Sequence, residues 1–217
     1  MSVPAGRHLV WDWNGTLLDD LSLVMTATNV AFASVDAPPV TPDDHRRRFR
    51  RPIVDYYGEV LGRVVTPEEF AQLDRIFHDA YRQGLVNAAL AADAEHAMRS
   101  WPGGQSLLSM WFHDELVPLV HGFGLQSLLA RIDGLRATVG GGPKAGHLAE
   151  HLVALGLSGG QVVLIGDSLD DADAAEAVGA GCVLYTGGLT HPELLAARGV
   201  PVATTLVEAV RLAARLD

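Results

Sequence analysis

Short hydrophobic runs alternate along the chain with stretches in which apolar residues recur every three or four positions. The runs lie near residues 8–12, 105–109, 137–140, 162–166, 182–186 and 201–206. Runs of this length predict β-strands, and the stretches between them predict helices. The run at 162–166, VVLIG, is almost continuously hydrophobic, as expected for a parallel strand covered on both faces. The pattern therefore predicts an α/β fold with a parallel sheet.

The pattern changes between the first and second runs, where no convincing strand is found. Apolar residues recur there at helical intervals, at Leu21, Val24, Met25, Thr28, Phe32 and Val35, and again at Phe70, Leu73, Phe77 and Tyr81. The segments TPDD from Thr41 and TPEE from Thr66 are typical of helix N-caps followed by proline. We expect an all-helical insert over residues 20–95 and a core made of residues 1–19 and 96–217.

Composition and charge limit the possible partners. The chain has 217 residues, of which 48% are hydrophobic, so it can bury a sizeable core. Its formal net charge of −10 disfavours binding to nucleic acid or to anionic membranes. Cys182 is the only cysteine, and the sequence shows neither a signal-peptide pattern nor a long apolar run. We expect a cytoplasmic protein with no nucleic-acid or membrane partner.

Polar residues collect where the predicted strands end. They follow the apolar runs or open the helices after them, at Asp12, Ser109, Lys144, Asp167, Asp170 and Asp171. Ligands of open α/β sheets bind outside the carboxyl ends of the strands, so these groups are expected to converge. Clustered carboxylates repel one another and favour a divalent cation such as Mg²⁺. Ser109 and Lys144, the only lysine, suit phosphoryl oxygens, and the whole set indicates phosphoryl transfer to or from a carboxylate.

Four motifs follow one another along the chain. They are DWNGT from Asp12, with Asp19 downstream, then Ser109 in SLLSM, Lys144 in GGGPKAGH, and GDSLDD from Gly166 to Asp171. In this order they resemble the motifs of the haloacid dehalogenase superfamily of aspartate-nucleophile hydrolases, in which Asp19 matches the downstream acid. The order and spacing match over essentially the whole chain, in the phosphoglycolate-phosphatase-like branch with a small helical cap. The resemblance implies a Rossmann-like three-layer core, with the insert as its cap.

The resemblance also implies a Mg²⁺-dependent phosphatase that acts on a small phosphorylated metabolite. Asp12 would attack phosphorus and form an aspartyl-phosphate. Asp12, Asp167 and the backbone carbonyl of Asn14 would hold Mg²⁺, while Asp171 would act on the waters of the metal or on Lys144. The phosphoryl oxygens would be held by Ser109 and Lys144.

Asn14 departs from the family pattern, in which the second Asp of the first motif is the acid/base. The departure predicts slow turnover, and an alternative is a phosphate-sensing or partner-binding protein that has lost turnover. Carbon–halogen hydrolysis needs no metal, so the acidic cluster around Asp167 argues against it. Phosphonate cleavage through a Schiff base would use a lysine in the cap, and the insert contains none.

Several of these segments also have a plainer explanation. DWNGT alone fits a strand that enters an Asn-Gly turn, and Lys144 alone fits a solvated surface lysine. In RRRFRR, at residues 46–51, Arg47 and Arg50 are candidates for binding the anionic substrate. A solvated face that balances an acidic protein is an equally good interpretation of that cluster.

Overall fold

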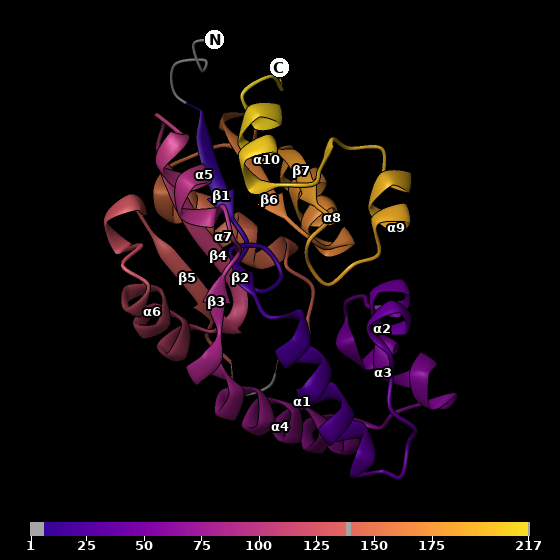
Figure 1. The fold of residues 1–217 in the computed structure, drawn as a ribbon. Helices are drawn as coiled ribbons and strands as arrows, with labels where there is room; N and C mark the ends of the chain where they lie inside the picture. Colours follow the sequence, from indigo (N-terminus) through magenta and orange to yellow (C-terminus); the bar gives the residue numbers. More distant parts are fainter. Residues whose placement is uncertain (1–6, 138–139, 217) are drawn as a thin grey trace.

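The computed structural model describes residues 7–137 and 140–216, and its centre is a parallel sheet (Figure 1). Within these ranges the sheet has six strands in the order β5-β4-β1-β6-β7-β8, and every neighbouring pair is parallel. The strands are β1 (His8–Trp11), β4 (Gln105–Phe112), β5 (Ile132–Leu135), β6 (Val162–Gly166), β7 (Gly181–Tyr185) and β8 (Val202–Ala203). The predicted α/β fold with a parallel sheet is therefore confirmed.

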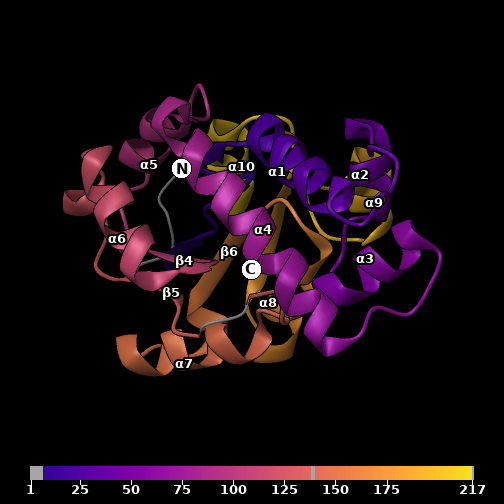
Figure 2. The same cartoon turned by 90° about the horizontal axis from the view of Figure 1, so that it is seen from below.

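Helices cover both faces of the sheet and complete three layers, seen edge-on in Figure 2. Successive strand residues point to opposite faces. Leu9 and Trp11 of β1 pack toward one helical layer, whereas Val10 packs toward the other. The first layer contains α5 (Ala94–Ser100), α6 (His113–Gly122) and α10 (Leu206–Ala213). The second contains α7 (Ala145–Leu155), α8 (Leu169–Val178) and α9 (Pro192–Ala197). This arrangement is the Rossmann-like three-layer core that the resemblance implied.

Four helices form a separate group beyond one end of the sheet (Figure 1). They are α1 (Leu21–Ala33), α2 (Pro42–Arg48), α3 (Ile53–Leu61) and α4 (Pro67–Gly84), and they share a hydrophobic cluster of their own. Thr41 accepts the backbone N–H of Asp44, and Thr66 accepts that of Glu69, so both predicted N-caps form. None of the helices in the described ranges has the length and apolarity needed to cross a membrane.

The segment between β1 and β4 also contains strands, which the hydrophobic pattern did not predict. β2 (Leu18–Asp19) pairs antiparallel with β3 (Ala89–Leu90), so the chain entering and leaving α1–α4 is tied side by side. The expectation of no strand here was wrong, because two-residue strands are too short to show a period. The short 3₁₀ helices are η1 (Leu85–Asn87), η2 (Gln126–Leu128) and η3 (Gly159–Gln161).

β5 lies at the sheet edge and was also missed. The run expected at 137–140 includes residues 138–139, which lie outside the described residues, and the neighbouring strand is Ile132–Leu135. This strand is mostly half-buried and contains Asp133, which pairs with Arg131 and with His151 Nδ1 at 2.7 Å. An edge strand with one neighbour has no need of a continuous hydrophobic run.

Candidate active site

The predicted polar residues meet at the carboxyl ends of the three central strands. Asp12 directly follows β1, Asp167 directly follows β6, and Lys144 directly precedes α7. These three side chains, together with Asn14 and Arg51, line a narrow cleft of about 30 Å³. The convergence follows from the strand order, because β1 lies between β4 and β6.

Lys144 is the buried cation of the cleft. Its side chain is 2% exposed, and its Nζ lies 2.8 Å from Asp12 Oδ1. The same Nζ pairs with Asp171, which is fully buried. Burial alone would lower the pKa of Lys144, but the charges of Asp12 and Asp171 raise it well above its usual range. Lys144 therefore remains charged and neutralises part of the acidic cluster.

Three carboxylates crowd this cation. One oxygen from each of Asp12, Asp167 and Asp171 lies within 4.8 Å of the others. Burial raises the pKa of Asp12 and of Asp167, and the neighbouring carboxylates raise both pKa values further. Three buried acids against one lysine leave the cluster short of positive charge. An oxygen-rich donor set of this kind fits a hard divalent cation.

Asp167 is held in a fixed position. Its Oδ1 accepts the Thr16 hydroxyl at 2.9 Å, and its Oδ2 accepts the Leu189 backbone N–H at 2.6 Å. A Cβ at Gly15 would come within 2.4 Å of this carboxylate, and one at Gly188 within 2.1 Å. Gly15 also has φ +72°, which side-chain-bearing residues rarely adopt. Both glycines are therefore required for the Asp167 carboxylate to sit beside Asp12.

Asp171 faces Lys144 rather than the cleft. One of its oxygens pairs with Lys144, and the other accepts the backbone N–H of Ser168 at 3.0 Å and its hydroxyl at 2.6 Å. Both oxygens are thus occupied by protein groups. Of the two roles implied for Asp171, this geometry supports the one that acts on Lys144.

Asn14 is clamped by a buried network that sequence analysis did not predict. Its Nδ2 donates to Asp20 Oδ2 and to the Tyr81 hydroxyl oxygen, each at 2.8 Å. Tyr81 donates its own proton to Asp20 Oδ2 at 2.6 Å. On the other side, Asn14 Oδ1 accepts the Ser109 hydroxyl at 3.2 Å. Both amide protons of Asn14 are therefore donated to Asp20 and Tyr81, which do not line the cleft.

The acid behind Asn14 is Asp20, not Asp19. Asp20 is 1% exposed, and its Oδ1 accepts the Gly15 backbone N–H at 2.7 Å, whereas Asp19 is exposed. Burial raises the pKa of Asp20, and the hydrogen bonds from Asn14 and Tyr81 oppose this rise. Asp19 lies in β2, where adjacent side chains point to opposite sides. Tyr81 was predicted only as part of a helical stripe, because a contact across 61 residues leaves no local signal.

Ser109 lies within β4 and is 1% exposed. Its hydroxyl oxygen accepts the Trp111 N–H at 3.0 Å while its proton is donated to Asn14. The structure therefore places Ser109 behind Asn14, adjacent to the cleft.

The structure does not bring Arg47 or Arg50 to the cleft. Arg47 is exposed and pairs with Asp43 at 2.9 Å and Glu193 at 3.1 Å, while Arg50 pairs with Glu59. α2 ends at Arg48, so Arg50 and Arg51 lie outside the helix that carries Arg47.

Arg51 is the member of the cluster that lines the cleft. Its side chain is 18% exposed, its Nη1 donates to the Gly142 carbonyl at 3.2 Å, and its Nε lies 3.6 Å from Asp170 Oδ2. Since a guanidinium carries five N–H donors, Arg51 keeps donors available for an anion in the cleft.

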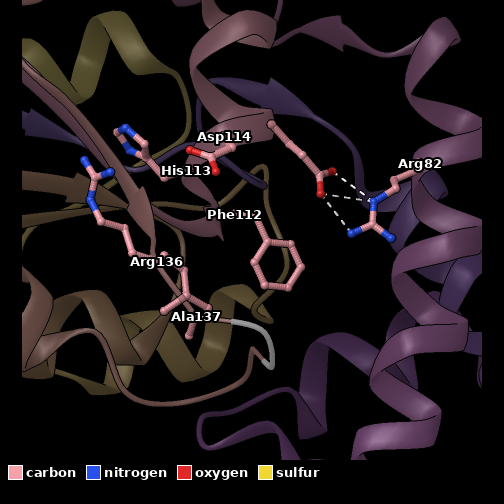
Figure 3. A pocket seen from close by; sticks show the side chains of 8 residues that line it. Arg82, Phe112, His113, Asp114, Arg136 and Ala137 are labelled. Atoms are coloured by element: carbon pink, nitrogen blue, oxygen red, sulfur yellow. Dashed lines mark hydrogen bonds and ion pairs between the residues drawn. The ribbon is translucent and has the colours of Figure 1, made fainter.

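A larger hollow of about 550 Å³ lies away from these carboxylates, at the start of α6 (Figure 3). Its lining includes Phe112, His113, Asp114 and Arg136. Arg82 closes one side through a forked pair with Glu115 at 2.8–3.1 Å. The chemistry-bearing residues identified above line the smaller cleft instead.

Comparisons with known proteins agree with this fold. Residues 139–209 match the family described as HAD-hydrolase-like. A phosphoglycolate phosphatase from Chromobacterium violaceum is 23% identical over 203 residues, covering 88% of this chain and 90% of the relative. A predicted phosphatase from Clostridium acetobutylicum superposes with a TM-score of 0.86 at 14% identity, over 98% of this chain and 100% of the other. A predicted phosphoglycolate phosphatase from Haemophilus somnus gives a TM-score of 0.76 at 18% identity, over 97% and 99%. In its four motifs, in residues 139–209 and in its fold, the chain is thus similar to haloacid dehalogenase-like hydrolases.

Proposed function

We propose that this hydrolase is a Mg²⁺-dependent phosphatase that removes the phosphoryl group from a small metabolite through an aspartyl-phosphate on Asp12. The observation that carries the proposal is the contact between Asp12 Oδ1 and Lys144 Nζ at 2.8 Å, beside Asp167 in one cleft. A carboxylate beside a buried cation is suited to attack a phosphoryl group, because the cation reduces the repulsion between the carboxylate and this anionic target. The relative from Chromobacterium violaceum, a phosphoglycolate phosphatase, supports the same reaction class.

The residues that would hold Mg²⁺ are Asp12, Asp167 and the backbone carbonyl of Asn14. Their oxygens suit this cation, and the excess of buried carboxylate gives it a counter-charge. Bound there, Mg²⁺ would reduce the repulsion between Asp12 and a phosphate dianion and polarise the phosphoryl group. Asp171 contributes by holding Lys144 in place.

Lys144 and Arg51 are the proposed phosphoryl-binding cations. Both line the cleft, and each retains N–H donors that the protein does not use fully. Ser109 contributes through Asn14, whose Oδ1 it holds, and reaches a phosphoryl oxygen only by giving up that bond.

Slow turnover is part of the proposal. Departure of an alcohol requires a proton, and the later attack of water on the aspartyl-phosphate requires a base. Asn14 can supply neither, because an amide does not titrate and both its protons are donated to Asp20 and Tyr81. Substrates whose leaving groups depart without protonation, such as aryl and acyl phosphates, are therefore expected to react fastest.

We further propose that residues 1–19 and 96–217 form the catalytic core and that residues 20–95 form a cap. The separate hydrophobic cluster of α1–α4 supports this division. The locked amide of Asn14 also favours a second candidate, a phosphate-sensing or partner-binding protein that retains the cleft without turnover.

Phosphate release from a panel of phosphorylated metabolites, with and without Mg²⁺, tests the proposal. The panel should include acyl, aryl and alkyl phosphates, with Asp12→Asn as the matched control. We expect Mg²⁺-dependent release by the wild type and none by the variant. Equal release by the two proteins would refute Asp12 as the nucleophile, and binding of vanadate without any release would favour the sensing candidate.

A further inference from the structure

A second cavity lies among the helices of the proposed cap, directly beside the catalytic cleft. It measures about 80 Å³, against about 30 Å³ for the cleft. Phe49, Arg51 and Met110 line both spaces. Since they share these lining residues, the two spaces adjoin, and a group attached to a phosphoryl in the cleft would lie next to the cavity.

The cavity wall is mainly apolar and aromatic. Its apolar side chains come from α1, α3, α4, β4 and the loop after α2, and they are Val24, Phe49, Ile53, Tyr57, Phe77 and Met110. At about 15 Å³ for each water-sized group, the volume admits a group of roughly five or six heavy atoms. A compact ring fits this size, and aromatic walls favour a ring by stacking and edge contacts.

Two buried polar atoms on this wall lack a partner among the described residues, His45 Nε2 and His78 Nδ1, and His78 is already held through its other nitrogen by Asp74 at 3.2 Å. His45 lines the cavity and is 1% exposed, and its Nε2 is buried without a hydrogen-bond partner in the described part of the chain. The other ring nitrogen, Nδ1, lies 2.8 Å from the Tyr56 hydroxyl. A buried polar nitrogen without a partner is costly, so this atom indicates a position where a ligand atom belongs.

The protonation of the ring follows from its surroundings. Burial, with a smaller contribution from Arg46, lowers the pKa of His45 to about 4, so the ring is neutral at pH 7. Burial raises the pKa of Tyr56 well above its usual range, so Tyr56 keeps its proton. If Tyr56 donates to Nδ1, the hydroxyl is satisfied and the ring proton lies on Nε2. The arrangement with fewest unpaired groups therefore makes Nε2 a donor that awaits an acceptor.

We propose that this cavity binds the leaving group of the substrate, and that this group is a compact, largely apolar ring bearing an oxygen that accepts a hydrogen bond from His45. The inference rests on the proposed phosphatase function and adds the class of substrate, a phosphomonoester of a ring-bearing alcohol or phenol. Arg51 lines both the cleft and the cavity, so it would lie where the phosphoryl group joins the ring.

Binding of phosphonates, which are not hydrolysed as phosphate esters, separates this inference from turnover. In calorimetric titrations with Mg²⁺ present, benzylphosphonate should bind the wild type at least about tenfold more tightly than methylphosphonate, because one ring becomes buried. Equal affinities would overturn the inference. Release of phosphate from acetyl phosphate, whose leaving group is small, tests the proposed function separately.

Two variants on one helix provide a matched pair. Val24 of α1 lines the cavity and is 6% exposed, whereas Val30 of the same helix is 46% exposed. Val24→Phe should abolish the preference for benzylphosphonate and leave acetyl phosphate hydrolysis unchanged, while Val30→Phe should change neither. Ile53→Phe, which fills the cavity from α3, replaces Val24→Phe if the latter does not fold. A preference that survives in a folded cavity-filling variant would contradict the proposal.

His45→Phe tests the polar contact. The wild type should bind tetrahydrofurfurylphosphonate, whose five-membered ring carries an acceptor oxygen, more tightly than cyclopentylmethylphosphonate, and the variant should lose this advantage while still preferring a ring to a methyl group. If the advantage persists in His45→Phe, or is absent from the wild type, the oxygen acceptor has been wrongly assigned.

Discussion

Asn14→Asp is the substitution that tests the chemistry of the cleft most directly. The amide of Asn14 lies 2.8 Å from Asp20 Oδ2, so the substitution brings two carboxyl groups to hydrogen-bond distance inside the protein. Two like charges about 4 Å apart repel by roughly 4 kcal/mol at an effective dielectric constant near 20. This corresponds to a rise of about 3 pKa units, so the pair retains one proton near neutral pH. The variant thus keeps a proton between the carboxyl groups at positions 14 and 20, and the wild type has no such transferable proton at position 14.

Turnover of alkyl phosphates should therefore rise in Asn14→Asp by about 10² to 10⁴, the usual value of general acid/base catalysis. Aryl phosphates should gain less, because their leaving groups depart without a proton. Steady-state phosphate release with one alkyl and one aryl substrate measures both effects. The comparison is made in the Asp12→Asn background as well, where no gain is expected.

The exchange variant Asn14→Asp/Asp20→Asn is the control for charge. It keeps one carboxyl and one amide in the network but places the carboxyl at the cleft. Without a second carboxyl beside it, the group at position 14 should have a lower pKa than in the single variant. The acidic limb of its pH–rate profile should shift to lower pH accordingly. If freshly prepared wild type hydrolyses alkyl phosphates as fast as either variant, another residue is the acid/base and the reasoning on Asn14 is refuted.

Four further predictions follow from the geometry of the cleft. Asp167→Asn should weaken Mg²⁺ binding in calorimetric titration, and an unchanged affinity would remove Asp167 from the metal site. Lys144→Met should lower the free energy of unfolding by about 3 to 5 kcal/mol, because it leaves two buried carboxylates without their cation. Urea unfolding measures this loss, and a loss below about 1 kcal/mol would contradict the prediction. Arg51→Ala should raise KM for the best substrate, whereas Arg47→Ala should not, and the same KM in both variants would exclude Arg51 from substrate binding. Burial raises the pKa of Asp12 and of Asp167, so these two groups bind more protons in the metal-free folded protein than in the unfolded chain. The thermal stability of the wild type relative to Asp167→Asn should therefore fall as the pH rises above about 4, the ordinary carboxyl range, and added Mg²⁺ should offset this loss at the upper end; a relative stability that increases over this range would contradict the assignment.

The sequence predicted the central sheet well because burial on both faces leaves a strong signal. β6 is buried at all five positions and coincides with the run VVLIG. β5 has no such signal, because an edge strand tolerates Asp133 and partial exposure. The ribbon of β2 and β3 was missed for a different reason, since its two-residue strands are defined by their pairing and not by periodicity.

The same distinction explains which site residues could be predicted. Asp12 and Asp167 are fixed by strand ends, so locating the strands locates their side chains. The network around Asn14 depends on Tyr81, which reaches it from the last turns of α4. The cavity near His45 likewise depends on how four helices pack, and periodicity predicts that a helix forms without predicting which helix it meets.

The two hydrogen bonds that Asp20 accepts from residues 14 and 15 affect how the protein ages chemically. An Asn-Gly pair deamidates when the glycine backbone nitrogen attacks the asparagine side-chain carbon and closes a succinimide ring. Here one carboxylate holds both participants, because Asp20 Oδ1 accepts the Gly15 N–H at 2.7 Å and Oδ2 accepts the Asn14 amide at 2.8 Å. Ring closure must break both bonds, so the folded chain resists it and the reaction proceeds mainly in unfolded molecules. The deamidated fraction of a stored sample thus records how long its molecules have spent unfolded, and those succinimides that open to aspartate rather than isoaspartate place a carboxyl group at the one position where it would imitate a gain of catalytic activity.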